Sequence, residues 1–327
     1  LRNSIANVDD DGLYVGVIRQ TVLVQDNVID SVGNNSDTGD GIVVALTGTL
    51  AGGVAGGGGV TILNNTVTNV NANNAGGADF DNPGNFFGGT NSGFSAGDGI
   101  RAENIGGNLV VGDGTATGNS IRGVDDDGIQ VQTVRGNVTI LYNRIATVGI
   151  DSNLGDGITV ADVGAAYAGG ATSGVLVNVS NNTIANVNGD GTSDPDDDDH
   201  SNGDGIRIVR VDGSARTDTN TINSVDDDGI YIGVIRGAVT VTNNRLTDMG
   251  LDSDTGDGIV VALTGTFAGG AAGAGGITID NNTITNVNAN TPGAPDFDNP
   301  DNFFGGKTAG YSSGDGIRAE NIDGNAT

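Results

Sequence analysis

The chain has 327 residues, a net charge of −28 and no cysteine. The negative charge excludes nucleic acid as a natural partner, because phosphate binding needs a basic surface, and it argues against anionic membrane surfaces. The missing cysteine excludes disulfides and thiol chemistry, and no apolar run is long enough for membrane insertion.

Aspartate dominates the acidic residues. It supplies 39 of the 41 acids, and Glu103 and Glu320 are the only glutamates. Acidity that served only solubility would be expected to use both residue types. The excess of aspartate therefore indicates turn geometry, cation binding or both.

Nine similar units follow one another along the chain. Each begins with Asn-x-[Ile/Val/Leu] and continues into one Asp-Gly-[Ile/Leu]. Within a unit such as 220–243, three short apolar runs predict three short strands, each with one buried face. The DDDG and RGA segments between the runs predict turns. The units start at Asn3, Asn27, Asn65, Asn119, Asn143, Asn182, Asn220, Asn244 and Asn282.

The units differ in length in a regular order. Successive starts are 24, 38, 54, 24, 39, 38, 24 and 38 residues apart, which gives a repeating series of short, medium and long units. Three super-repeats therefore cover 3–118, 119–219 and 220–327. The long units carry loops at 71–97, 188–203 and 288–314, and the medium units carry a second insertion at 45–59, 161–174 and 262–276.

A unit of three short strands cannot bury its own apolar residues, so the units must stack on one another. The sequence predicts one continuous β-solenoid over 1–327, with a core of stacked Ile, Val and Leu and no separate cap domains. Nine coils at roughly 4.8 Å each give a rod about 43 Å long. We expect the chain to be a segment of a longer tandem array.

The NNT[IV]xNV and [GD]DGIxV units resemble the right-handed parallel β-helix superfamily, the pectin-lyase-like solenoids. The resemblance covers essentially the whole chain and is to the non-enzymatic repeats of surface and fibre proteins. It implies an all-β, single-stranded, right-handed parallel β-helix of about nine coils, with the long loops on one side.

The Asp-Gly-Ile units predict a row of carboxylates about 4.8 Å apart along the solenoid. Like charges at that spacing repel, and Ca²⁺, which takes six to eight oxygen ligands, is the natural counter-ion. The alternative is that aspartates cap turn amides, helped by Arg101, Arg207 and Arg318 just after Asp-Gly-Ile. The candidate ligands are Asp9, Asp10, Asp11, Asp40, Asp98, Asp125, Asp126, Asp127, Asp156, Asp204, Asp226, Asp227, Asp228, Asp257 and Asp315.

The long loops hold a second group of candidates. Their alternating acids are either further calcium ligands or a solvated acidic surface, and they are Asp194, Asp196, Asp198, Asp296, Asp298 and Asp301. Large apolar residues in the loops and insertions are either folded back or exposed as contacts between rods. They are Leu50, Phe86, Phe87, Tyr167, Phe267, Phe303 and Phe304.

Asparagine pairs recur at the unit starts, as in Asn64-Asn65, Asn181-Asn182 and Asn281-Asn282. The NNT sequence is also a glycosylation acceptor pattern. Stacked asparagine side chains that hydrogen-bond along a turn are the expected arrangement in a parallel β-helix, and we favour that interpretation.

The sequence does not favour an enzyme, because the VDDDG motif repeats three times and His200 is the only histidine. The favoured function is structural: an extracellular or cell-surface filament, sheath or stalk that assembles with itself, end to end and laterally, and is stabilised by several Ca²⁺ ions. The alternative is the stalk of a large adhesin that binds glycans or a cell surface. An acidic-polysaccharide lyase or hydrolase, which could in principle use paired carboxylates, is the remote alternative.

Overall fold

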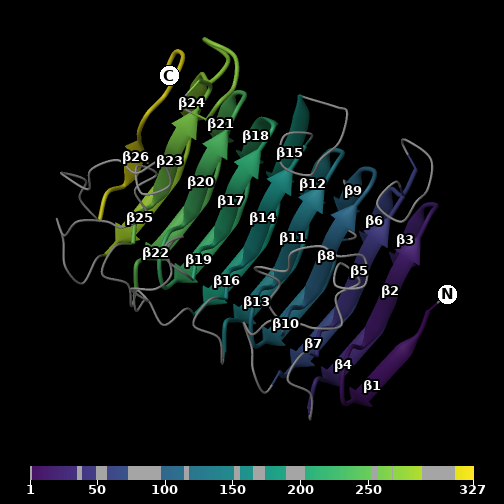
Figure 1. The fold of residues 1–327 in the computed structure, drawn as a ribbon. Helices are drawn as coiled ribbons and strands as arrows, with labels where there is room; N and C mark the ends of the chain where they lie inside the picture. Colours follow the sequence, from purple (N-terminus) through teal and green to yellow (C-terminus); the bar gives the residue numbers. More distant parts are fainter. Residues whose placement is uncertain are drawn as a thin grey trace.

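A computed structural model describes residues 2–34, 39–48, 57–72, 97–113, 118–150, 155–164, 174–188, 203–251, 256–266, 268–288 and 314–327. These residues form 26 strands and no helix. All strands pair in parallel, in two sheets of nine strands and one of eight. The chain progresses along one axis, so that the two termini lie at opposite ends of the molecule (Figure 1).

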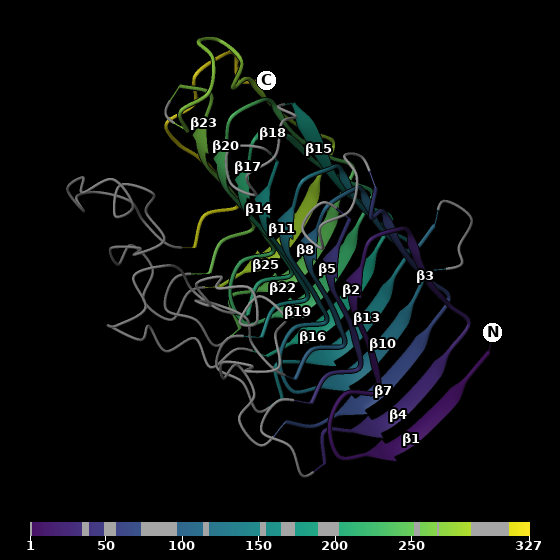
Figure 2. The ribbon, with the colours of Figure 1, turned by 45° about the vertical axis from the view of Figure 1, so that its right-hand side comes forward.

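Each coil contributes one strand to each of three sheets, here called A, B and C. Sheet A runs in the order β1, β4, β7, β10, β13, β16, β19, β22, β25, as Figure 2 shows. Its strands are β1 (Ser4–Val8), β4 (Val28–Val32), β7 (Thr66–Val70), β10 (Ser120–Val124), β13 (Arg144–Val148), β16 (Thr183–Val187), β19 (Thr221–Val225), β22 (Arg245–Met249) and β25 (Thr283–Val287).

Sheet B follows sheet A in every coil. Its strands are β2 (Leu13–Ile18), β5 (Ile42–Thr47), β8 (Ile100–Ile105), β11 (Ile129–Val134), β14 (Ile158–Val163), β17 (Ile206–Val211), β20 (Ile230–Ile235), β23 (Ile259–Thr264) and β26 (Ile317–Ala319). Sheet C closes each coil with β3 (Val22–Gln25), β6 (Val60–Leu63), β9 (Leu109–Val111), β12 (Val138–Leu141), β15 (Val175–Ser180), β18 (Gly213–Asp218), β21 (Val239–Thr242) and β24 (Ile277–Asp280).

This connectivity confirms the predicted parallel β-solenoid, a three-faced parallel β-helix. Neighbours in every sheet are three strands apart in sequence, because each strand pairs with its equivalent in the coils before and after it. The unequal unit lengths are absorbed at the corners. The long loops lie between sheets A and B, and the medium-unit insertions lie between sheets B and C.

The core is a single stack of small apolar side chains. Equivalent residues lie directly over one another, as Ile129 does between Ile100 and Ile158. The inward-facing Ile, Val and Leu residues of all three sheets form one cluster that extends from Val22 to Ile277. Fully burying one such side chain contributes about 1.5–3 kcal/mol, so the core grows with each coil and confirms the predicted aliphatic ladders.

Left-handed backbone conformations explain why asparagine is so common. The residue before each unit start turns the chain from sheet C to sheet A, and Asn64, Asn181 and Asn281 have φ values of 50°, 58° and 56° there. Asparagine tolerates this region better than other side chains do. Two bulky residues of sheet B, Val17 and Leu46, also have left-handed backbone conformations, with φ values of 58° and 55°. This conformation costs more free energy for a bulky side chain than for asparagine.

The asparagine that starts each unit belongs to a continuous hydrogen-bonded ladder. The side-chain oxygen of each accepts the side-chain amide of the preceding one at 2.8–3.1 Å, from Asn3 through to Asn282. From Asn27 to Asn244 the backbone N–H of each also donates to the next oxygen. The predicted stacking of asparagines is therefore confirmed.

Removing one rung should destabilise the whole rod. Asn143 accepts two hydrogen bonds from Asn119 and donates to Val111 and Asn182. We expect Asn143→Ala to cost about 1–3 kcal/mol for each buried group left without a partner. The midpoint of urea unfolding measures this loss. Exposed Arg144 offers the matched control, and equal midpoints for Asn143→Ala and Arg144→Ala would contradict a stabilising ladder.

Candidate metal sites on the aspartate ladder

A second ladder lies where the chain enters sheet B. The carboxylate of each Asp-Gly-[Ile/Leu] aspartate accepts the backbone N–H of the equivalent aspartate in the next coil, at 2.5–3.1 Å. The prediction that these aspartates cap turn amides is confirmed. The nine ladder residues are Asp11, Asp40, Asp98, Asp127, Asp156, Asp204, Asp228, Asp257 and Asp315.

The glycine after each ladder aspartate is required by close packing. A Cβ on Gly128 would lie 2.5 Å from a methyl group of Ile145 and 2.6 Å from the carbonyl oxygen of Gly157 in the next coil. In the Asp-Gly-Ile sequence, the aspartate thus caps a backbone amide, the glycine allows two coils to approach closely, and the isoleucine packs in the core.

The ladder carboxylates are buried, and each needs a source of positive charge or a proton. From Asp40 to Asp257 their residues are at most 3% exposed. Two unit charges about 4.8 Å apart repel by about 3.5 kcal/mol at an effective dielectric constant of 20. We name the three kinds of contact between coils by the units they join: short-to-medium, medium-to-long and long-to-short junctions.

Arginine supplies the positive charge at every medium-to-long junction. Arg101 lies 2.9 Å from Oδ2 of Asp40. The equivalent pairs are Arg207 with Asp156 at 3.5 Å and Arg318 with Asp257 at 3.1 Å. The predicted help from these three arginines is therefore confirmed. Burial nonetheless outweighs Arg207 and raises the pKa of Asp156 above its ordinary value of 3.8.

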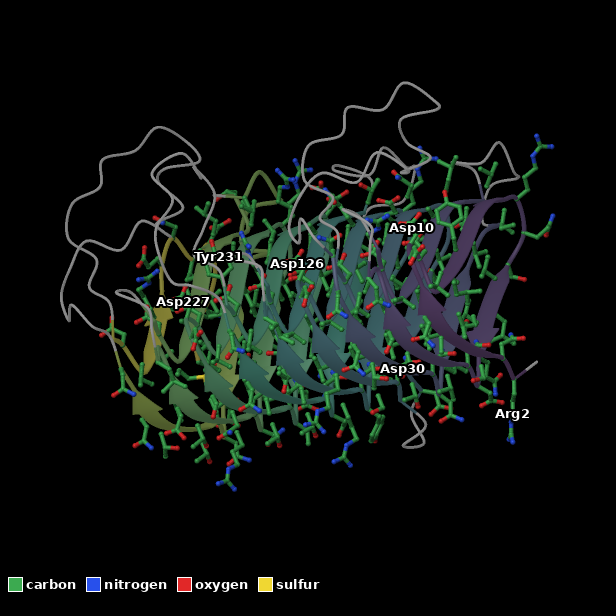
Figure 3. All side chains as sticks on the ribbon, turned by 90° about the horizontal axis from the view of Figure 1, so that it is seen from below. Arg2, Asp10, Asp30, Asp126, Asp227 and Tyr231 are labelled. Atoms are coloured by element: carbon green, nitrogen blue, oxygen red, sulfur yellow. The ribbon has the colours of Figure 1, made fainter. Side chains whose placement is uncertain are left out.

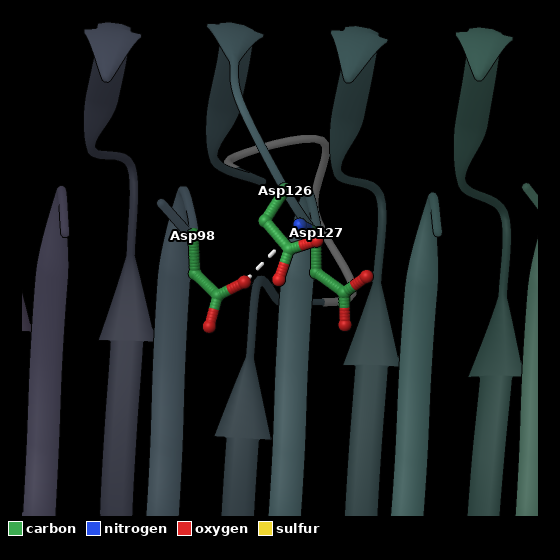
Figure 4. Close-up of side chains that lie close together, drawn as sticks. All are labelled: Asp98, Asp126 and Asp127. Carbon is green, nitrogen blue, oxygen red and sulfur yellow. Dashed lines mark hydrogen bonds between the residues drawn. The ribbon is translucent and has the colours of Figure 1, made fainter. Parts of the chain in front are cut away.

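The two long-to-short junctions of the described residues hold clusters of three aspartates instead. One joins Asp98 of the long unit to Asp126 and Asp127 of the following short unit (Figure 4). The other joins Asp204 to Asp227 and Asp228, again buried. In each cluster, one oxygen from every residue lies within 4.8 Å of the others. Asp126 and Asp227 recur along the same side of the rod (Figure 3).

Electrostatics in the first cluster disfavours three charged carboxylates. Burial, then the charges of Asp40 and Asp126, raises the pKa of Asp98 well above its ordinary value. Burial and Asp126 raise the pKa of Asp127 in the same direction. Oδ1 of Asp98 accepts the N–H of Asp127, but its buried Oδ2 accepts no hydrogen bond from any described residue.

The donor set fits a hard divalent cation. Carboxylate oxygens are the preferred ligands of Ca²⁺ and Mg²⁺, and the buried Oδ2 of Asp98 is an oxygen that such an ion would satisfy. These two acidic clusters could therefore hold metal ions.

The other predicted ligands are placed differently. Asp40, Asp156 and Asp257 bind arginine, and Asp125 accepts the N–H of Ala72 at 2.8 Å. Among the described residues, no three-acid group includes Asp9, Asp10, Asp11, Asp226 or Asp315. The loop acids Asp194, Asp196, Asp198, Asp296, Asp298 and Asp301 lie outside the described residues, as do Leu50, Phe86, Phe87, Tyr167, Phe267, Phe303 and Phe304.

Sequence reasoning missed how the aspartates divide among junctions. The signal was present, because the residue before the ladder aspartate is aspartate only in short units. It is glycine in medium and long units, as at Gly39 and Gly97. Reading that position together with the order of units would have singled out the two clusters.

Comparisons of the chain with protein-family models, curated sequences and solved structures gave no significant match. Within the described residues, no helix has the length and apolar character needed to cross a membrane.

Breaking a buried arginine pair should be costly. Arg101→Gln leaves Asp40 buried without its guanidinium, and we expect a loss of about 3–5 kcal/mol. Arg216→Gln removes a half-exposed pair with Asp218 and should cost no more than about 1 kcal/mol. Urea unfolding of both variants measures the difference, and similar small losses would contradict the assigned role of Arg101.

The stability of the metal-free protein should fall as pH rises. The raised pKa values of Asp98, Asp127 and Asp11, the last about 8 because of burial and Asp40, mean that the folded chain keeps protons that the unfolded chain releases near pH 3.8. This contribution is complete below pH 3.8 and disappears as pH passes the folded values. Thermal unfolding in metal-free buffer should show a lower Tm at pH 8.5 than at pH 5, and the reverse order would contradict these shifts.

Proposed function

We propose that the protein is structural and forms or extends an extracellular filament, sheath or stalk by stacking β-helix coils. The observation that carries the proposal is the uniform joining of one coil to the next. The same parallel sheets, asparagine ladder and aspartate ladder run through every coil. Length is therefore gained by adding units, as in other repeat proteins whose stability is the sum of unit and interface terms.

Repetition of the acidic clusters also supports a structural role over a catalytic one. Asp98, Asp126 and Asp127 have equivalents in Asp204, Asp227 and Asp228, at the same junction one super-repeat later. A catalytic site normally depends on one asymmetric set of groups, whereas a clamp between coils is useful wherever the coils meet.

We further propose that Ca²⁺ occupies both clusters and clamps each long coil to the following short coil. Three aspartates provide at least three oxygens, and Ca²⁺ completes a shell of six to eight ligands with carbonyl groups or water. Mg²⁺ demands a stricter octahedral shell, which makes it the weaker candidate. A bound ion would offset the repulsion among the buried carboxylates and stabilise the folded rod.

Chelation tests both parts of the proposal. Ca²⁺ at 100 times its Kd should stabilise the rod by about 2.7 kcal/mol per site. We therefore expect a lower Tm in EDTA by circular dichroism, two ions bound per chain by calorimetry, and filaments in electron micrographs that shorten or separate in EDTA. Asp126→Asn should remove one ion, whereas the control Asp30→Asn, at a half-buried position of β4 outside both clusters, should remove none.

Three outcomes would count against the proposal. An unchanged Tm and no bound ion would exclude calcium clamps and leave protonated carboxylates as the explanation of the buried clusters. Chains that stay monomeric with or without Ca²⁺ would contradict assembly. Soluble monomers that bind a glycan would favour the adhesin alternative.

A further inference from the structure

We propose that the cation at each long-to-short junction takes the charge-balancing role of the arginine at each medium-to-long junction, and that neutral Gln130 and Tyr231 are the residues that leave this role to a cation. The inference rests on the proposed cation and assigns its position and its determinant. A guanidinium group and a metal ion are then alternative positive charges that balance the carboxylates of one aspartate ladder.

The arginines occupy one register position of sheet B. Arg101 pairs in register with Val43 in the coil before it and with Gln130 in the coil after it. From this position it reaches back to Oδ2 of Asp40 in the preceding coil. Arg207 does the same for Asp156, and Arg318 for Asp257. The position therefore controls the charge balance of the ladder aspartate one coil earlier.

At the long-to-short junctions the same position is neutral. Gln130 lies in register with Arg101, and Tyr231 with Arg207. By the same register, the ladder aspartates one coil before Gln130 and Tyr231 are Asp98 and Asp204 of the long units. Neither side chain carries a positive charge, and both are buried, with Gln130 7% and Tyr231 1% exposed.

The equivalent oxygen atom differs in its charge partner between the two junctions. Oδ2 of Asp40 and Oδ2 of Asp98 are both buried and accept no hydrogen bond from any described residue. Oδ2 of Asp40 forms an ion pair with Arg101 at 2.9 Å, whereas no described arginine lies within ion-pair distance of Oδ2 of Asp98. A cation beside Asp98 would therefore meet the oxygen that an arginine meets one coil earlier.

Every unit that carries the added acid also lacks the arginine. The extra aspartate before the ladder residue is found at Asp10, Asp126 and Asp227, all in short units. In those same units the arginine position holds Tyr14, Gln130 and Tyr231. Short-to-medium junctions lack arginine too, but their medium units carry glycine in place of the extra aspartate. The third carboxylate and the neutral residue at the arginine position thus define the cation site jointly.

Gln130→Arg tests the inference, with Ca²⁺ as the probe. A guanidinium at this position should displace the ion from the first cluster and leave the second intact. We expect calorimetry to show one Ca²⁺ per chain instead of two, and the fall in Tm on adding EDTA to be about halved. Gln132→Arg is the charge-matched control, because residue 132 lies on the same strand and face but pairs with Glu103. It should still bind two ions.

The outcomes separate this inference from the proposed function. A wild-type chain that binds no Ca²⁺ would overturn both. A wild-type chain and a Gln130→Arg variant that each bind two ions would overturn only the inference. Tyr231→Arg provides an independent second variant, expected to lose the ion of Asp204, Asp227 and Asp228. If Gln130→Arg does not fold, retention of both ions in Tyr231→Arg overturns the inference, and loss of one supports it.

Discussion

Parallel stacking of equivalent residues is the constraint on which this structure depends. When every strand pairs with its own equivalent in the next coil, each side chain meets the equivalent residue of that coil about 4.8 Å away. A position that repeats one residue type along the rod is stable only if that residue is compatible with copies of itself. Ile and Val satisfy this by packing, and asparagine satisfies it because its amide both donates and accepts.

Aspartate is the exception, since an ionised carboxylate only accepts hydrogen bonds and repels its copies. The chain uses one of its two oxygens to accept a backbone N–H, which joins the coils. The negative charge of the carboxylate is then balanced in different ways from one junction to the next. Arg101 balances it at one junction, whereas burial and the charge of Asp126 raise the pKa of Asp127 at another. The super-repeat of three units is thus reflected in the electrostatics.

Much of the fold could be predicted from the sequence, because the solenoid repeats its local signals nine times. The unit starts, the strands and the asparagine ladder follow from motifs that are visible in a single unit.

The acidic clusters were harder to predict. Their members were all recognised, but grouping Asp98 with Asp126 requires the register between coils, which depends on how a 54-residue unit closes onto a 24-residue unit. A neutral residue such as Gln130 does not by itself indicate a metal site in the sequence. Its proposed role follows only from the structure, in which it lies in register with Arg101.

The placement of length variation at the corners has a geometric consequence. Units of 24, 38 and 54 residues each advance the rod by one strand spacing, because the strands of every unit pair with their equivalents in the coils before and after, whatever the length of the segments between them. Axial length is therefore counted in coils and is independent of residue number. The connecting segments can therefore change in length or sequence while the distance between any two coils stays fixed.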